Sequence, residues 1–131
     1  MKEVLKISKT IELRKIIKSI LSETNRDVFF ERADKNSIYP YIVYSIESIN
    51  FNFGEREDVI LSVNIWDKNE SSSRIEVLTD EIEKKFMFNN KPTEKILPTF
   101  YLESRNVIPD EDELIKRREL RILIQNYYIG G

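Results

Sequence analysis

The sequence predicts an α+β domain in which two helices pack on a mostly antiparallel sheet of four to five strands. Residues 39–49 and 59–66 are rich in β-branched and aromatic residues and flank a short polar break, which favours an antiparallel pair of strands. Residues 73–88 follow with apolar residues at spacings of three and four, which is typical of an amphipathic helix. Two further strand-like segments, 99–107 and 114–128, complete the chain. The helix is therefore expected to lie across the apolar face of the paired strands.

The first part of the chain predicts a helix and a short strand. Residues 8–23 alternate apolar and basic groups near helical spacing, and the turn formers at 22–25 end the segment. Residues 1–7 are either an extension of this helix or an apolar arm. Residues 27–32 predict a strand, which a polar turn at 33–37 follows. The apolar repeat of the helix consists of Ile11, Ile16, Ile17, Ile20 and Leu21.

The two paired strands have a distinct apolar and a more polar face. Pro40 lacks an N–H group and therefore belongs at a strand start or on an edge. Trp66 falls on the more polar face of the second strand, together with Ser62 and Asn64. It either packs under the second helix or anchors a contact, because aromatic side chains dominate interface energetics. The predicted apolar face consists of Val59, Leu61, Val63 and Ile65.

The second helix begins at a serine-rich segment, where Ser73 and Glu76 have the spacing of a capping box. Residues 89–95 predict a loop, and Pro98 ends a short apolar pair before the next strand starts at residue 99. The apolar stripe of the helix consists of Ile75, Leu78, Ile82 and Phe86.

The final segment, 114–128, fits helical spacing as well, but its long alternation and its β-branched and aromatic residues favour a strand. Residues 129–131 predict a loose end. One face of the strand is predicted to carry Arg118, Leu120, Ile122, Ile124 and Tyr128, and the other Arg117, Glu119, Arg121 and Gln125.

Length and composition indicate one globular domain spanning residues 1–131. The chain is 40% hydrophobic and 34% charged, and its net charge of -2 gives no global basic field for nucleic acid. No apolar run approaches the roughly 20 residues of a transmembrane helix. The first residues lack the features of a secretory signal, and cysteine is absent, which fits a cytoplasmic product.

The residue types present argue against catalysis. Histidine and cysteine are absent, and the scarce glycines exclude a glycine-rich phosphate loop. An enzyme would have to rely on carboxylates alone, so we expect no enzymatic activity, no cofactor and no metal. The densest carboxylate cluster lacks the spacing and glycine of a calcium loop, which favours a solvated loop or a charged contact surface. It consists of Asp110, Glu111, Asp112 and Glu113.

Two other charged groups allow two interpretations each. The tip of the predicted hairpin is either a simple polar turn or a loop that protrudes into a neighbour or a pore. The basic residues of the last strand either bind nucleic acid or pair across strands with nearby carboxylates, and we prefer the pairing. The tip comprises Phe51, Phe53, Glu55, Arg56, Glu57 and Asp58, and the basic set Lys116, Arg117, Arg118 and Arg121.

Three features of the sequence resemble those of one protein family. They are the run Tyr-Pro-Tyr-Ile-Val-Tyr at 39–44, the strand end Val-Asn-Ile-Trp-Asp at 63–67, and the serine-rich cap with the helix that follows it. They are similar to the tail-terminator, or tail-completion, proteins of tailed bacteriophages. Arg105, the acidic loop and the arginine-rich last strand match the layout of that family. The resemblance covers most of the chain, from residue 11 to residue 128.

The resemblance implies a structural protein that forms a homohexameric ring on the last ring of tail-tube proteins. Such a ring ends tube polymerisation and offers a docking surface to the head connector or collar. DNA passes through the lumen without being read. The protein would be made in the host cytoplasm and then become part of the virion, or of a prophage-encoded, bacteriocin-like tail.

A ring of this kind requires two different patches on each subunit. We expect the acidic loop of one subunit to meet the basic set of the next, and the hairpin tip to face the tube or lumen. The alternatives are a head–tail connector or another minor tail protein, and more remotely a nucleic-acid-binding α+β module.

Overall fold

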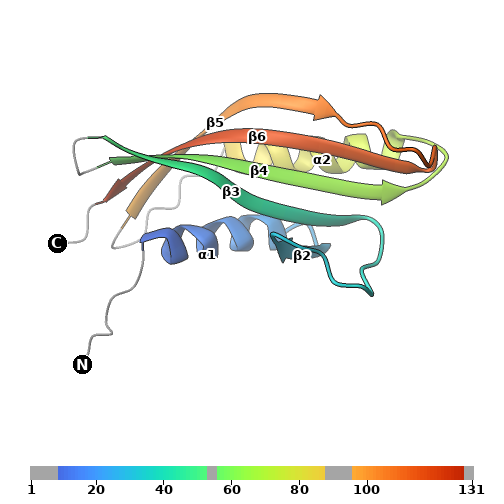
Figure 1. The fold of residues 1–131 in the computed structure, drawn as a ribbon, viewed down its shortest axis with the longest axis horizontal. Coiled ribbons are helices and arrows are strands. Elements are labelled where there is room, and N and C mark those ends of the chain that lie inside the picture. Colours follow the sequence, from blue (N-terminus) through green and yellow to red (C-terminus); the bar gives the residue numbers. More distant parts are fainter. Residues whose placement is uncertain (1–8, 53–55, 88–95, 129–131) are drawn as a thin grey trace.

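The computed structural model describes residues 9–52, 56–87 and 96–128, and it confirms the predicted α+β class (Figure 1). The predicted order of helix, short strand, two strands, helix and two strands is also confirmed. The long strands run along the long axis of the molecule, with the helices beside them. The elements are α1 (Lys9–Ser22), β2 (Asp27–Phe30), β3 (Tyr41–Asn52), β4 (Arg56–Lys68), α2 (Ser73–Met87), β5 (Ile96–Val107) and β6 (Ile115–Tyr128).

The five strands form one sheet in the order β2-β3-β4-β6-β5. β2 pairs with β3 in parallel, and the other three pairs are antiparallel. In the central pair, Leu61 of β4 lies opposite Ile122 of β6, and Val63 lies opposite Leu120. Because directly paired residues point to the same side, the apolar alternations of the strands coincide on one face of the sheet.

Both helices pack on that apolar face, which we call the covered face, in one continuous hydrophobic core. The predicted stripe of α2 is confirmed, since Ile75, Leu78, Ile82 and Phe86 are all buried. The predicted face of β4 is confirmed in the same way. The helix α1 contributes Leu13, Ile17, Ile20 and Leu21 to the core, and the strands contribute Ile42, Tyr44, Val59, Leu61, Val63, Ile65, Ile96, Phe100, Leu120, Ile122 and Ile124.

The inclusion of Ile11 in the apolar repeat of α1 was wrong. Its side chain is 45% exposed, whereas Leu13 is buried. A helix turns by about 100° per residue, so Leu13 and Ile17 lie on one face, while Ile11 lies about 120° away from Ile17. At the other end of α1 the predicted turn is confirmed: Thr24 N donates to Leu21 O at 3.1 Å, and Asn25 adopts a φ of 60°.

The opposite side of the sheet, which we call the uncovered face, has neither of the two described helices on it. Trp66 lies there, paired with Tyr41 of β3 and Arg117 of β6. It therefore does not pack under α2. Pro40 directly precedes β3, as predicted, because the strand begins at Tyr41.

The prediction of a turn over all of residues 51–58 was wrong at both ends. Phe51 and Asn52 still belong to β3, and β4 already begins at Arg56. The charged residues Arg56, Glu57 and Asp58 continue the ladder because their pairing with β6 extends to Tyr127. Polar composition alone had indicated a turn there. Residues 53–55 lie outside the described part of the chain.

Two further predictions were wrong in detail. β5 begins at Ile96 and contains Pro98, because an edge strand tolerates a residue without an N–H group. Ser73 and Glu76 form no capping box: Ser73 N donates to Ser71 Oγ at 3.1 Å, and the Glu76 carboxylate pairs with arginines of β5 and β6.

None of the described helices has the length and apolar content of a membrane span. The predicted loop at 89–95 lies outside the described residues.

Candidate subunit-contact surfaces

The centre of the uncovered face is organised around Arg121. Register shifts place one extra residue in each of two strands, Glu47 in β3 and Glu103 in β5. Arg121 Nη1 hydrogen-bonds Glu47 Oε1, and Arg121 Nε lies 3.9 Å from Glu103 Oε1. Glu119 Oε2 lies 4.0 Å from Arg121 Nη1. The hydrogen bond to Glu47 raises the pKa of the guanidinium above its ordinary value, so Arg121 stays charged. The predicted cross-strand pairing is confirmed for this residue.

A polar chain links this centre to the end of β4. Ser62 Oγ donates to Glu119 Oε2 at 2.8 Å, and Asn64 Nδ2 donates to Ser62 Oγ at 3.0 Å. Arg117 then donates to Asn64 Oδ1 through Nε at 3.1 Å and Nη2 at 2.8 Å. The chain fixes the guanidinium of Arg117 in one position on the uncovered face.

Aromatic side chains continue the row beyond Arg117. Its guanidinium carbon lies 4.6 Å from the centre of the Trp66 ring, a cation–π geometry. Trp66 stacks on Tyr41 with centroids 6.2 Å apart, and Phe29 of β2 meets Tyr41 edge-on at 6.1 Å. Burial raises the pKa of the Tyr41 hydroxyl, and neighbouring Tyr39 raises it further, so Tyr41 remains protonated at neutral pH. This end of the uncovered face is therefore largely aromatic.

The predicted acidic cluster lies in the exposed connection between β5 and β6, and we call residues 110–114 the acidic loop. Two of its carboxylates stabilise the backbone conformation of the loop. Asp110 Oδ1 accepts a hydrogen bond from Asp112 N at 3.0 Å, and Asp112 Oδ1 accepts one from Leu114 N at 2.9 Å. Glu113 O accepts from Lys116 Nζ at 2.6 Å. The side chains of Glu111 and Glu113 have no hydrogen-bond partner within the described residues.

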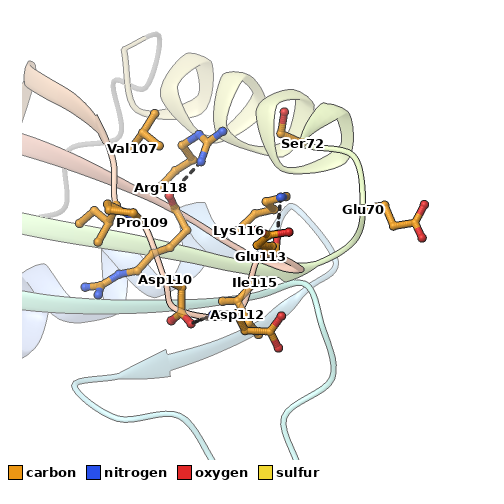
Figure 2. A pocket seen from close by; sticks show the side chains of 12 residues that line it. Glu70, Ser72, Val107, Pro109, Asp110, Asp112, Glu113, Ile115, Lys116 and Arg118 are labelled. Carbon is orange, nitrogen blue, oxygen red and sulfur yellow. Dashed lines mark hydrogen bonds between the residues drawn. The ribbon is translucent and has the colours of Figure 1, made fainter.

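Beside the acidic loop the surface is hollowed by about 540 Å³ (Figure 2). Lys116 points to Glu113 there, whereas Arg118 points towards α2. The hollow thus brings the predicted acidic and basic groups close together within one chain. Besides Glu113, Lys116 and Arg118, its walls include Glu70, Ser72, Val107, Pro109, Ile115 and Arg117.

Arg118 lies on the covered face and is only 8% exposed. Its Nε donates to Glu76 Oε1 of α2 at 2.5 Å. Arg105 of β5 binds the same helix, with Nη2 at 3.2 Å from Glu76 Oε2 and Nη1 at 2.6 Å from Asp80 Oδ1. These two arginines fasten α2 to the sheet. The function of Arg118 within the chain is therefore structural, and its predicted contact with a second subunit stays a prediction.

The hairpin tip is only partly described. Arg56 and Asp58 form an ion pair with Nε 3.0 Å from Oδ1, and a hydrogen bond to Tyr127 raises the pKa of Arg56. Glu57 is buried and accepts from Asn126 Nδ2 at 3.4 Å. The side chain of Phe51 is not described, and Phe53 and Glu55 lie outside the described residues. The contact of this tip with a tube or lumen stays a prediction.

Sequence reasoning missed the two bulge glutamates, Glu47 and Glu103, because no sequence pattern marks where an extra residue enters a strand. It also missed a second hollow, of about 280 Å³, on the outside of α1, which we call the α1 hollow. The available signal was that Ile11 lies off the helical stripe that Leu13 and Ile17 form, close to Arg14, Lys15 and Lys18 in the sequence. The α1 hollow is lined by Ile11, Arg14, Lys15, Lys18 and Tyr44.

Within residues 9–52, 56–87 and 96–128 there is no group of three or more His, Cys, Asp or Glu side chains arranged to hold a metal ion. At the centre of the uncovered face Arg121 is bound to Glu47 and lies within 4.0 Å of Glu103 and Glu119, so the described part of this face has a fixed arrangement of charge.

Comparison with known proteins gives a likeness in fold. The structure matches that of the bacteriophage SPP1 gp17 protein with a TM-score of 0.57, at 17% sequence identity, over 86% of this chain and 86% of that chain. No protein-family model matches the sequence, and no curated protein matches it either. The chain thus has the fold of a bacteriophage protein, in agreement with the phage family that its sequence resembles.

Proposed function

We propose that this protein is a structural component of a phage or phage-like tail, where it caps the tail tube as a ring. The ring ends tube polymerisation and provides the docking surface for the head connector or collar. The observation that carries this proposal is the fold shared with a bacteriophage protein over 86% of both chains. The sequence resemblance to tail-terminator proteins supplies the particular role, including the hexameric ring.

The surfaces of the domain suit a ring. Closed rings require head-to-tail contacts between two unlike patches of each subunit. The uncovered face, the exposed acidic loop and the α1 hollow are chemically different and are carried by different elements. The core on the covered face keeps these patches in fixed relative positions, so subunits can meet without refolding.

The proposed partners are further copies of this chain, the tail-tube protein, and a head connector or collar protein. The hairpin tip, residues 51–58, is the proposed contact with the tube or lumen, through which DNA passes without being read. The protein would act in the host cytoplasm during assembly and remain in the particle afterwards. None of these roles requires catalysis.

The alternative role as a head–tail connector differs in the neighbour that is bound. A nucleic-acid-binding role for the arginines of β6 is less well supported, because that function needs cations available to phosphates. Arg117 is held by Asn64, and Arg118 and Arg121 are paired with carboxylates of the same chain.

Deleting the corresponding gene from its phage or defective element and measuring tail length by electron microscopy tests the proposal. A terminator predicts overlong tubes of irregular length, restored to uniform length when the protein is supplied. Tubes of normal length that fail to join heads would assign the protein to the connector side instead. Normal, joined particles would contradict both roles.

A further inference from the structure

We propose that the acidic loop of one copy docks into the α1 hollow of the next copy. This contact rests on the proposed ring and assigns its two halves to particular residues. One half carries carboxylates and an exposed leucine, and the other carries lysines around an apolar floor. The two halves therefore match in charge and in apolar character.

The α1 hollow has an apolar floor and a basic rim. Tyr44 is buried below it, and Arg14 lies over the Phe30 ring at 3.8 Å from its centre, which fixes one wall. The Lys15 side chain is 71% exposed, and within the described residues its one ion pair is with Glu12 at 3.6 Å, a weak interaction for so exposed a lysine. Lys18 is exposed and has no ion-pair partner within the described residues. The rim therefore offers positive charge to a partner.

The acidic loop has the complementary composition. Its four carboxylates are exposed, and Leu114 at its end is 40% exposed. The loop is already folded, because Asp110 and Asp112 accept hydrogen bonds from its own backbone and Asn69 N donates to Leu114 O at 2.8 Å. Docking would then cost little ordering entropy. Glu111 and Glu113 are left to meet the lysines.

The arginines of β6 are less suitable partners for this loop. Arg117 is held by two hydrogen bonds to Asn64, and Arg121 is hydrogen-bonded to Glu47. Arg118 is buried against Glu76. An incoming carboxylate would have to displace these partners, whereas Lys18 needs no such exchange.

The two halves lie towards opposite ends of the molecule. Figure 1 shows α1 starting near the end of the molecule where β3 ends and β4 begins, while the connection between β5 and β6 lies at the other end. The acidic loop therefore reaches the α1 hollow of a neighbour and not its own. A contact between two different patches is heterologous, and repetition of it generates a ring when the rotation closes.

Two charge-reversed variants of the full chain test this contact. The first combines Lys15→Glu with Lys18→Glu, and the second combines Glu111→Lys with Glu113→Lys, which leaves the loop-folding aspartates intact. Either variant alone places like charges opposite each other, so its self-association should weaken at least about tenfold relative to the unaltered protein. Sedimentation velocity over a concentration series measures this, and circular dichroism checks that each variant is folded.

An equimolar mixture of the two variants gives the sharper result. The acidic loop of the first then meets the basic hollow of the second, and the lysine loop of the second meets the acidic hollow of the first. The mixture should therefore associate more strongly than either variant does alone. Exposed lysines that belong to neither half provide the control, with Lys35→Glu and Lys84→Glu expected to associate like the unaltered protein.

The inference would be overturned by an unaltered chain that stays monomeric up to its solubility limit, by reversed variants that associate normally, or by a mixture that does not recover. Weakening by Arg117→Glu as large as that by the lysine pair would also overturn it, because the loop would then dock on β6. Should the first variant not fold, Lys15→Gln with Lys18→Gln replaces it.

Tube capping, measured in parallel, separates this inference from the proposed function. Reversed variants that associate normally and still limit tube length would remove the contact and leave the function. If the variants associate as expected but the protein has no effect on tube length, the contact between copies would stand and the proposed function would be removed.

Discussion

The two faces of the sheet are made from the same strands but have different tasks. β6 directs Leu120, Ile122 and Ile124 into the core and directs Glu119 and Arg121 to the uncovered face. Burying an aliphatic side chain contributes about 1.5–3 kcal/mol, whereas an exposed ion pair contributes about 0–1 kcal/mol. The covered face therefore stabilises the domain, while the uncovered face and the acidic loop are free to be specialised for contacts.

The largest effect is expected from removing an aliphatic side chain on the covered face. Leu61 of β4 is 0% exposed, so Leu61→Ala should lower the free energy of unfolding by about 2–5 kcal/mol, because it leaves a cavity in the core. Leu123 of β6 is the matched control, since it is paired with Ile60 on the uncovered face. We expect Leu123→Ala to lose about 1 kcal/mol or less in urea unfolding. Equal losses would contradict the division into two faces.

A smaller difference is expected between the arginines of the two faces. Arg118→Ala removes a nearly buried guanidinium bound to Glu76 and should lower the free energy of unfolding by roughly 1.5–3 kcal/mol. Arg121→Ala removes a half-exposed guanidinium from the uncovered face and should lower it by about 1 kcal/mol or less. Thermal unfolding of both variants measures the comparison. A greater loss at Arg121 would mean that its network contributes more to the fold than the core-side pair.

The smallest effect on stability is expected at Arg117. Trp66 is the only tryptophan in the sequence, so its fluorescence reports directly on the uncovered face. Arg117→Ala should change the emission and increase quenching by acrylamide, while the free energy of unfolding falls by about 0.5–1 kcal/mol. Lys84→Ala, on α2, should leave the emission unchanged. An unchanged emission in the Arg117 variant would mean that its guanidinium does not shield the indole.

Periodicity predicted the fold well where burial decides the structure. The alternation of Val59, Leu61, Val63 and Ile65 and the stripe of α2 follow directly from which side chains must leave water. It did not predict that β4 begins at Arg56, because pairing between strands there outweighs the polar composition. Nor did it predict the bulge at Glu47, since the register of two strands is a property of their pairing.

The candidate surfaces were predicted less completely. The exposure of the acidic loop follows from its charge, which favours hydration over burial. The partners of Arg117, Arg118 and Arg121 are separated from them by tens of residues in the sequence and depend on the order of the strands. The α1 hollow also depends on tertiary structure, because Tyr44 of β3 forms part of it.

The most direct test of the proposed function is the length of tail tubes assembled in vitro from the tail-tube protein of the same element. This protein is added at increasing ratios during polymerisation, and the tube lengths are measured by electron microscopy. We predict that amounts far below one chain per tube subunit shorten the tubes, with the protein found only at tube ends. Tubes of unchanged length at a molar excess, or protein bound all along the tube, would contradict the proposal.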